Sequence, residues 1–255
     1  MLGAIVGDIV GSVYEFKNIK TKKFRLFKKG CFFTDDTVLT VSLAEAIMTG
    51  RDYAYLMREY YRKYPNRGYG YRFSIWVENE SMGPYNSWGN GSAMRISPVG
   101  FAFDTIEEVL DHAKKYSEIT HNHPEGIKGA QATASAIFLA RKGVSKIEIK
   151  KFIENNFGYD LSESLDEIRP NYRFNESCQE TVPQAIIAFL ESTDFEDPIR
   201  NAISLGGDSD TLACITGGIA EAYYGLPEKI AKKAMEYLDE FLIKTVLKFR
   251  EKFCR

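Results

Sequence analysis

Two short stretches of the sequence each place a pair of aspartates beside a threonine at the start of an apolar run. They are FTDDT at 33–37 and GGDSDT at 206–211. Aspartate and threonine commonly cap helix N-termini, because their oxygens accept hydrogen bonds from free backbone N–H groups and carboxylates favour the positive helix end. Taken singly, each stretch is explained by capping. Capping needs only one carboxylate, however, and each stretch supplies two.

Considered together, the two stretches predict a metal centre. If both helix starts meet in space, four carboxylates share one pocket, and their repulsion must raise pKa values or be neutralised by cations. Hard oxygen ligands of this kind suit two ions of Mg²⁺, Mn²⁺ or Ca²⁺ better than zinc or copper. The expected ligands are the carboxylates of Asp35, Asp36, Asp208 and Asp210, helped by the hydroxyls of Thr34 and Thr211.

The other potential metal ligands are too few or too scattered for a zinc enzyme or a disulfide framework. Only three histidines occur, His112, His121 and His123, and the four cysteines contain no CxxC pair. Spaced in this way, the cysteines are typical of buried free thiols rather than of disulfides or a thiolate zinc site. Any metal must therefore be held by oxygen.

Helices dominate the elements that must position these residues. Capping signals and apolar spacing predict helices over about 35–49 and 124–141. The segments 181–192, 196–207, 210–225 and 227–250 repeat the pattern, whereas few stretches alternate like strands. The chain is predicted to form one all-α domain over residues 1–255, with the tyrosine-rich stretch 60–90 as an irregular excursion over its surface.

The first segment is predicted to be a buried central helix over 3–15. Gly3, Gly7 and Gly11 recur every four residues, so on a helix they leave one face bare for a close neighbour. A short buried strand in GAIVGDIVG is the alternative, because short apolar runs fit either structure.

Composition gives little guidance about partners. Lysine and arginine total 33 against 35 acidic residues, so the net charge of −2 does not favour nucleic acid or membrane. No window is long and apolar enough for a membrane span, and the first residues lack the features of a secretory signal. We expect a cytoplasmic protein with no membrane association, and favour a monomer.

Five motifs in order resemble those of the ADP-ribosylglycohydrolase family: GDIVGSVYE (7–15), TDDT (34–37), GNGSAMR (89–95), ITHNHPEGIKGA (119–130) and GGDSDT (206–211). Each is weak alone, but their joint occurrence over roughly residues 3–225 is specific. The resemblance implies a compact, single-domain orthogonal helical bundle with a binuclear Mg²⁺ or Mn²⁺ centre in a cleft, and an ADP-ribosylated protein, small molecule or nucleic acid as substrate.

The resemblance also implies roles for individual residues. It makes Thr34, Asp35, Asp36, Asp208, Asp210 and Thr211 metal ligands, with Asp210 as the bridging carboxylate. Glu15 matches a mobile acid near the scissile bond, although its position alone is equally typical of a surface acid at a helix end. Gly89, Asn90, Gly91, Ser92 and His121, together with Gly206 and Gly207, are assigned to substrate binding. From its position before Pro124, His123 is instead expected to cap a helix.

Two further segments are open to two interpretations each. The stretch 17–29 holds seven basic residues and no acid, which fits a solvated loop or one that attracts an anionic substrate. The rings of Trp76, Tyr85 and Trp88 fit surface packing as well as adenine stacking or a partner protein.

The expected reaction is hydrolysis of the glycosidic bond at C1 of the distal ribose in an ADP-ribosyl group. Glu15 is the first candidate for handling the protons, with Asp35 or Asp36 as a second base. YNSWGNGS (85–92) contains no acid to pair with a guanidinium, which argues against an arginine acceptor. A binuclear phosphohydrolase that cleaves the diphosphate and a non-catalytic ADP-ribose-binding protein are the alternatives.

Overall fold

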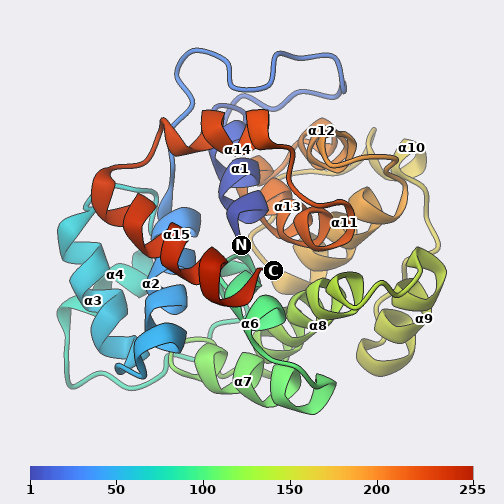
Figure 1. Cartoon of the computed structure of the whole chain (residues 1–255). Coiled ribbons are helices and arrows are strands. Elements are labelled where there is room, and N and C mark those ends of the chain that lie inside the picture. The colour runs from blue at the N-terminus through green and yellow to red at the C-terminus, as the bar shows by residue number, and fades with distance from the viewer. Residues whose placement is uncertain (255) are drawn as a thin grey trace.

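The computed structural model describes residues 1–254, which form fifteen α-helices and no β-strand (Figure 1). An isolated antiparallel bridge joins Gly89 and Ser177. The helices are α1 (Leu2–Gly11), α2 (Asp35–Thr49), α3 (Tyr53–Lys63), α4 (Tyr71–Glu78), α5 (Gly91–Met94), α6 (Ser97–Ala102), α7 (Ile106–Glu118), α8 (Pro124–Arg141), α9 (Lys146–Phe157), α10 (Leu165–Ile168), α11 (Cys178–Leu190), α12 (Glu196–Leu205), α13 (Ser209–Tyr224), α14 (Glu228–Met235) and α15 (Glu240–Phe253). The prediction of an all-helical protein is confirmed, and none of these helices could cross a membrane.

Helix α1 lies at the centre of the molecule and packs along α13, with all ten of its residues buried. The glycine face of α1 makes this contact. A Cβ atom at Gly7 would collide with the backbone of Ala213, and one at Gly11 with that of Asp210. The predicted central helix is therefore confirmed and the short strand is wrong. The close approach of the two backbones sets the start of α13 beside the end of α1.

The helix α1 ends earlier than the sequence predicts. It stops at Gly11 rather than at residue 15, and a turn follows in which Tyr14 N–H donates to the Gly11 carbonyl at 2.8 Å. Glu15 consequently lies on an irregular segment and not at a helix end. This placement carries its side chain over the start of α13.

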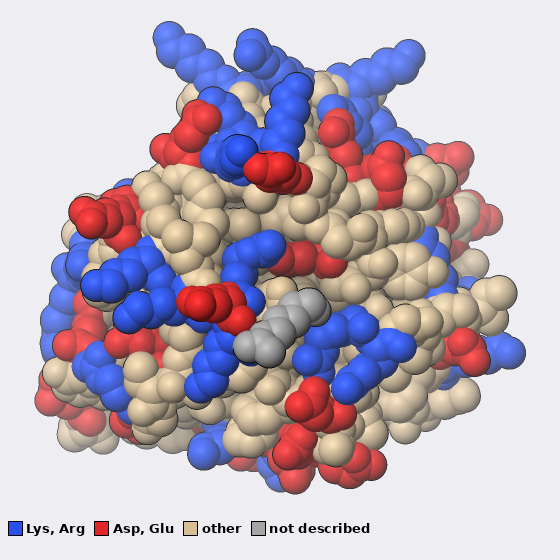
Figure 2. All heavy atoms as spheres, viewed as in Figure 1, with Lys and Arg blue, Asp and Glu red and all other residues tan. Residues whose placement is uncertain are grey.

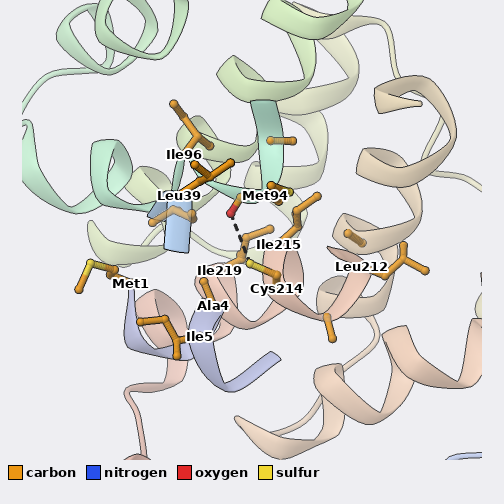
Figure 3. Packing of buried hydrophobic residues seen from close by; sticks show 14 of the residues in the cluster. Met1, Ala4, Ile5, Leu39, Met94, Ile96, Leu212, Cys214, Ile215 and Ile219 are labelled. Carbon is orange, nitrogen blue, oxygen red and sulfur yellow. Dashed lines mark hydrogen bonds between the residues drawn. The ribbon is translucent and has the colours of Figure 1, made fainter. Parts of the chain in front are cut away.

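The buried core is continuous between α1, α2 and α13. Figure 3 shows Ile5 of α1, Leu39 of α2 and Ile215 of α13 in one cluster, which also includes Met94 of the short helix α5. In the same view the Cys214 thiol donates to the carbonyl of Met94 at 3.3 Å. All four cysteines are free and three of them are buried, as the sequence predicts.

The predicted helices 35–49 and 124–141 match α2 and α8. The segment 227–250, in contrast, is two helices. Helix α14 ends at Met235, and α15 begins after Asp239, whose carboxylate accepts from Leu242 N–H at 2.9 Å. Since aspartate is a strong N-cap, it favours a new helix start over continuation of α14.

The stretch 60–90 lies mostly at the surface, as predicted, but it is not irregular throughout. It contains the end of α3 and all of α4, whose Phe73 and Trp76 are buried. The guanidinium of Arg58 lies 4.0 Å from the centroid of the Trp76 ring. Tyrosines and charges hide this apolar face in the sequence, because their rings and aliphatic stems pack in the core while their polar ends stay hydrated.

Candidate metal centre and substrate cavity

A cavity of about 530 Å³ collects the starts of α2, α5 and α13. Its walls include most of the residues predicted for the site: Glu15, Thr34, Asp35, Asp36, Gly89, Asn90, Gly91, His121, Asp208, Asp210 and Thr211. The two Asp-rich helix starts are far apart in the sequence but face one pocket, as the metal-centre hypothesis requires.

The start of α2 is fixed by Asp8 of α1, for which no role was predicted. The Asp8 carboxylate is fully buried and accepts from Thr34 Oγ1 at 2.8 Å, Thr34 N–H at 3.0 Å and Thr37 N–H at 3.1 Å, as well as from the Thr37 hydroxyl. Burial raises the Asp8 pKa to about 6 against the opposing effect of these hydrogen bonds. Asp8 thus holds Asp35 and Asp36 in place from below.

The start of α13 is fixed by a double-glycine turn. Gly206 and Gly207 have φ of 72° and 74°, a region that side chains other than glycine rarely adopt. The amide of Asn18 closes the turn by accepting from Gly207 N–H at 2.8 Å and donating to its carbonyl at 2.9 Å. This turn delivers Asp208, whose Oδ2 accepts from Asn90 Nδ2 at 2.7 Å.

The carboxylates of the cavity are close to one another. Glu15, Asp208 and Asp210 each offer an oxygen within 4.8 Å of the other two. Burial and the charges of Asp208, Asp8 and Glu176 raise the pKa of Glu15 to about 7. Burial and neighbouring carboxylates likewise hold the pKa values of Asp35, Asp36 and Asp210 well above the ordinary value. Without a counter-charge, this arrangement strongly favours protonated acids.

The oxygens in this cluster suit a divalent cation. Asp36 Oδ2 is buried and has no hydrogen-bond partner, while Asp36 Oδ1 accepts only a long bond of 3.4 Å from Thr211 Oγ1. No lysine or arginine among residues 1–254 forms an ion pair with these carboxylates. Buried carboxylates are normally paired or bound to metal, so the residues present fit a hard cation.

The opposite side of the cavity carries a neutral histidine. Thr120 Oγ1 accepts from Arg95 at 2.7 Å and lies 2.8 Å from His121 Nδ1. The Thr120 hydroxyl can donate one hydrogen bond and accept two, so its contact with Nδ1 fits both tautomers of the ring. Burial and the charges of Arg95 and Arg72 hold the pKa of His121 well below its ordinary value. His121 is therefore a neutral imidazole in the cavity wall.

The residues assigned to substrate binding fall into two groups: some line the cavity, and others lie outside its wall. Gly89 and Gly91 line the cavity beside His121, where a Cβ at Gly91 would lie 3.2 Å from Nε2. Asn90 also lines it, but its amide donates to Asp208 and Thr181. Ser92 is fully buried and donates to the Gly126 carbonyl at 2.7 Å. Ser92, Gly206 and Gly207 lie outside the cavity wall.

Other cavity residues were missed in the sequence. Gly68 lies so close to Asp35 that a Cβ atom there would be 3.2 Å from Oδ1, and the preceding Arg67 carbonyl accepts from Asp35 N–H at 2.8 Å. Glu176 adds an acid near Asp208. The sequence could have indicated a role for Asp8, because it is a lone acid within an apolar helix. Nothing in the sequence around Asn18 and Glu176 indicates theirs.

His123 is the N-cap of α8, as predicted, with Nδ1 accepting from Glu125 N–H at 3.1 Å. Trp88 is half exposed and packs edge-on against His123, and Tyr85 is buried in the cavity wall beside His121. Trp76 is buried away from the cavity lining. The three aromatic residues thus occupy three different environments.

Comparison with known proteins agrees with this site. The profile of the family described as ADP-ribosylglycohydrolase matches residues 1–253. The ADP-ribosylhydrolase ARH3 of Mus musculus is 28% identical over 89% of this chain and 83% of its own length. The ADP-ribosylarginine hydrolase Tri1 of Pseudomonas putida is 26% identical over 92% of this chain and 73% of its own. A solved structure described as an ADP-ribosylglycohydrolase-related protein complex superposes with a TM-score of 0.71 at 25% identity, covering 98% of this chain and 96% of that one.

Proposed function

Since the chain belongs to the ADP-ribosylglycohydrolase family and is an enzyme that hydrolyses ADP-ribose linkages, we propose that it uses two divalent cations to cleave the glycosidic bond at C1 of the distal ribose. The observation that carries this proposal is the convergence of Glu15, Asp208 and Asp210 on one point of the cavity. The reaction would take place beside a buried carboxylate cluster with which no lysine or arginine of residues 1–254 forms an ion pair.

The proposed ligands are Thr34, Asp35 and Asp36 from the start of α2 and Asp208, Asp210 and Thr211 from the start of α13. Mg²⁺ or Mn²⁺ is the expected metal, because all the donors are oxygens. When bound, such cations would neutralise the carboxylates and supply Lewis-acid polarisation of sugar hydroxyls and water. The orphaned Asp36 Oδ2 supports this ligand set.

Glu15 is the proposed proton carrier. It lies on the irregular segment after α1 and is only partly buried, so it reaches the cavity while remaining next to its mouth. In the protein without cations its pKa is raised to about 7, chiefly by burial, and burial continues to favour the protonated carboxyl when cations neutralise the neighbouring acids. The protonated carboxyl gives its proton to the departing acceptor atom, and the carboxylate then accepts a proton from the water that adds to C1. Asp35 or Asp36 is the second candidate base.

The opposite wall is proposed to hold the rest of the ADP-ribosyl group. His121 offers a neutral imidazole, and Gly89 and Gly91 let the substrate approach the backbone without side-chain obstruction. Asn90 also lines this wall, and its amide in addition orients Asp208. Ser92, Gly206 and Gly207 are proposed to support the loop and the turn from outside the cavity.

The test measures release of free ADP-ribose from arginine-linked, serine-linked and nucleic-acid-linked conjugates, with Mg²⁺ or with EDTA. Metal-dependent release from one of them supports the proposal and identifies the acceptor. AMP as the product would instead support cleavage of the diphosphate. Tight binding of ADP-ribose without release from any conjugate would contradict the proposed reaction.

A further inference from the structure

The segment 17–29, here named the basic ridge, is a strongly basic part of the surface. It holds seven of the 33 lysine and arginine residues and none of the 35 acids. In Figure 1 it forms the long loop at the top of the molecule, and in Figure 2 lysine and arginine side chains project from the same place. A protein with a net charge of −2 thus carries one concentrated positive surface.

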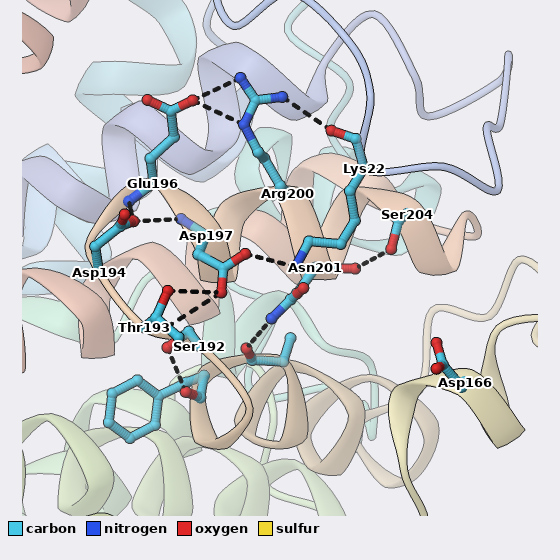
Figure 4. A network of polar contacts seen from close by, with 12 residues as sticks. Lys22, Asp166, Ser192, Thr193, Asp194, Glu196, Asp197, Arg200, Asn201 and Ser204 are labelled. Atoms are coloured by element: carbon cyan, nitrogen blue, oxygen red, sulfur yellow. Dashed lines mark hydrogen bonds and ion pairs between the residues drawn. The ribbon is translucent and has the colours of Figure 1, made fainter.

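The ridge is held in place against α12 and the double-glycine turn. Lys20 Nζ donates to the Tyr172 carbonyl at 2.8 Å and also to the Leu205 carbonyl. Figure 4 shows the second attachment, where Arg200 of α12 donates to the Lys22 carbonyl at 3.0 Å and Lys22 pairs with Asp197 at 2.5 Å. A surface fixed in advance loses less conformational entropy when it binds a partner.

Most of the ridge's charge is free for a partner. Among residues 1–254, no ion pair involves Lys17, Lys23, Arg25, Lys28 or Lys29. The acids that border the ridge on α12 are already paired, Asp197 with Lys22 and Glu196 with Arg200. Arg25 faces another cation, Lys233 of α14. The charge that remains calls for an anionic partner with several negative groups.

Exposed rings connect the ridge to the cavity. Phe16 precedes it and is 82% exposed, and Phe32 follows it and is 43% exposed, yet both side chains line the cavity. The Phe16 ring also stacks on that of Phe174, with centroids 6.0 Å apart. Rings left in solvent beside free cations suit a partner that supplies both flat aromatic groups and phosphates.

We propose that the basic ridge, with Phe16 and Phe174, binds single-stranded nucleic acid and leads it to the cavity mouth. Its phosphates would contact the free lysines and Arg25, and its bases would stack on the exposed phenyl rings. An acidic peptide would satisfy the charges but leave the rings uncovered. Together with the proposed function, on which this step rests, the inference assigns nucleic-acid-linked ADP-ribose as the substrate class.

Binding is tested without turnover, so the result does not depend on the proposed reaction. Fluorescence anisotropy is recorded with a labelled single-stranded oligonucleotide of about 15 nucleotides, between about 50 and about 200 mM salt. The full chain is compared with the triple variant Lys23→Ala, Arg25→Ala, Lys29→Ala. The matched control removes three exposed cations elsewhere, Lys151→Ala, Lys244→Ala, Lys248→Ala. Melting curves check that both variants fold.

The ridge variant should bind at least about tenfold more weakly. Its log affinity should also depend less steeply on log salt, with a slope smaller by about 0.7 for each phosphate that the variant no longer neutralises. The control should bind like the parent chain. Equal weakening in both variants, or unchanged binding in the ridge variant, would overturn the proposal.

The aromatic part of the proposal has its own test. Replacing both Phe16 and Phe174 by alanine should weaken oligonucleotide binding about fivefold or more, but leave binding of a wholly abasic oligonucleotide unchanged. Polyglutamate or anionic lipid vesicles that compete as well as the oligonucleotide would overturn the choice of nucleic acid. If the proposed function is wrong, the assay for ADP-ribose release gives no product, whatever the result of these binding measurements.

Discussion

The two sides of the cavity are built on different principles. The acidic side comes from helix starts seated on the buried helix α1, and its residues are bonded to elements far away in the chain, as Asp208 is to Asn90. The opposite side combines loop residues, such as Tyr85 and His121, with Arg72 near the start of α4. The exposed Arg72 donates to the Tyr85 carbonyl at 2.5 Å. Rigid elements hold the groups that must meet with precision, and loops can vary without disturbing the core.

The two sides of the cavity also differ in their effect on the free energy of folding. The acids of the first side are buried near one another and have raised pKa values, so their placement costs folding free energy until cations bind. Arg95 and His121 on the second side share Thr120 and include no pair of like charges in direct contact. Changes on the acidic side should therefore have the larger effects on activity and on metal-dependent stability.

The largest effect is expected for Asp210→Ala. This substitution removes the carboxylate at the centre of the cluster, so both bound metal and ADP-ribose release should fall by about a thousandfold or more. Isothermal titration with Mn²⁺ and a product assay measure the two effects. Full metal binding in this variant would move the metal centre away from the start of α13.

Glu15→Gln should separate proton transfer from metal binding. The amide keeps the size of the side chain but cannot exchange a proton, so turnover should drop by about a hundredfold or more while metal affinity stays close to that of the parent. If Mn²⁺ affinity falls together with turnover, Glu15 is a metal ligand, as its distance to Asp208 and Asp210 also permits.

Asp8→Asn tests the support beneath the acidic side. The amide would turn a donor toward the donors of Thr34 and Thr37, which should destabilise the fold by about 1–3 kcal/mol. Misplacement of Asp35 and Asp36 should weaken metal binding by about 10–100-fold, although Asp8 lines no part of the cavity. Urea denaturation measures the loss of stability, and titration with Mn²⁺ measures the weaker metal binding. The conservative change Asp8→Glu provides a comparison.

The free energy of unfolding of the metal-free protein should fall as pH rises. Acids in salt bridges, whose pKa values are lowered in the folded state, have the opposite effect. The folded-state pKa values of Asp8, Glu15 and the buried aspartates lie above their unfolded values, so the native state binds more protons. Stability should therefore fall, and Tm by several degrees, as pH rises from about 5 to about 8. Saturating Mg²⁺ should flatten the profile. A metal-free Tm that rises over this range would contradict the assigned shifts.

The smallest effect is expected on the side of the cavity that carries His121 and Arg72. Arg72→Ala removes an exposed cation at the cavity wall, so KM should rise about three- to tenfold with kcat and metal affinity unchanged. Steady-state kinetics on the best conjugate provide the measurement. A fall in kcat as large as that of Glu15→Gln would remove the contrast between the two sides.

Much of the fold could be predicted because its signals are local. The N-caps Thr34 and His123 and the C-cap Gly50 lie next to the helices that they bound, and α2 and α8 were placed correctly from them. Where predictions were wrong, a packed partner decided the outcome. The burial of Trp76 depends on Arg58 from α3, and the polar sequence around it gives no sign of that contact.

The sequence by itself determined that acids stand at two helix starts, that the donor atoms they offer are oxygens and that glycines leave one face of α1 bare. Only the tertiary structure decided which oxygens meet. Asp8 reaches Thr34 across 26 residues, Asn90 reaches Asp208 across 118, and Asn18 reaches Gly207 across 189. Capping and periodicity act within a turn or two of the chain, whereas these bonds form only where packing brings distant segments together, as the glycine face of α1 does for α13.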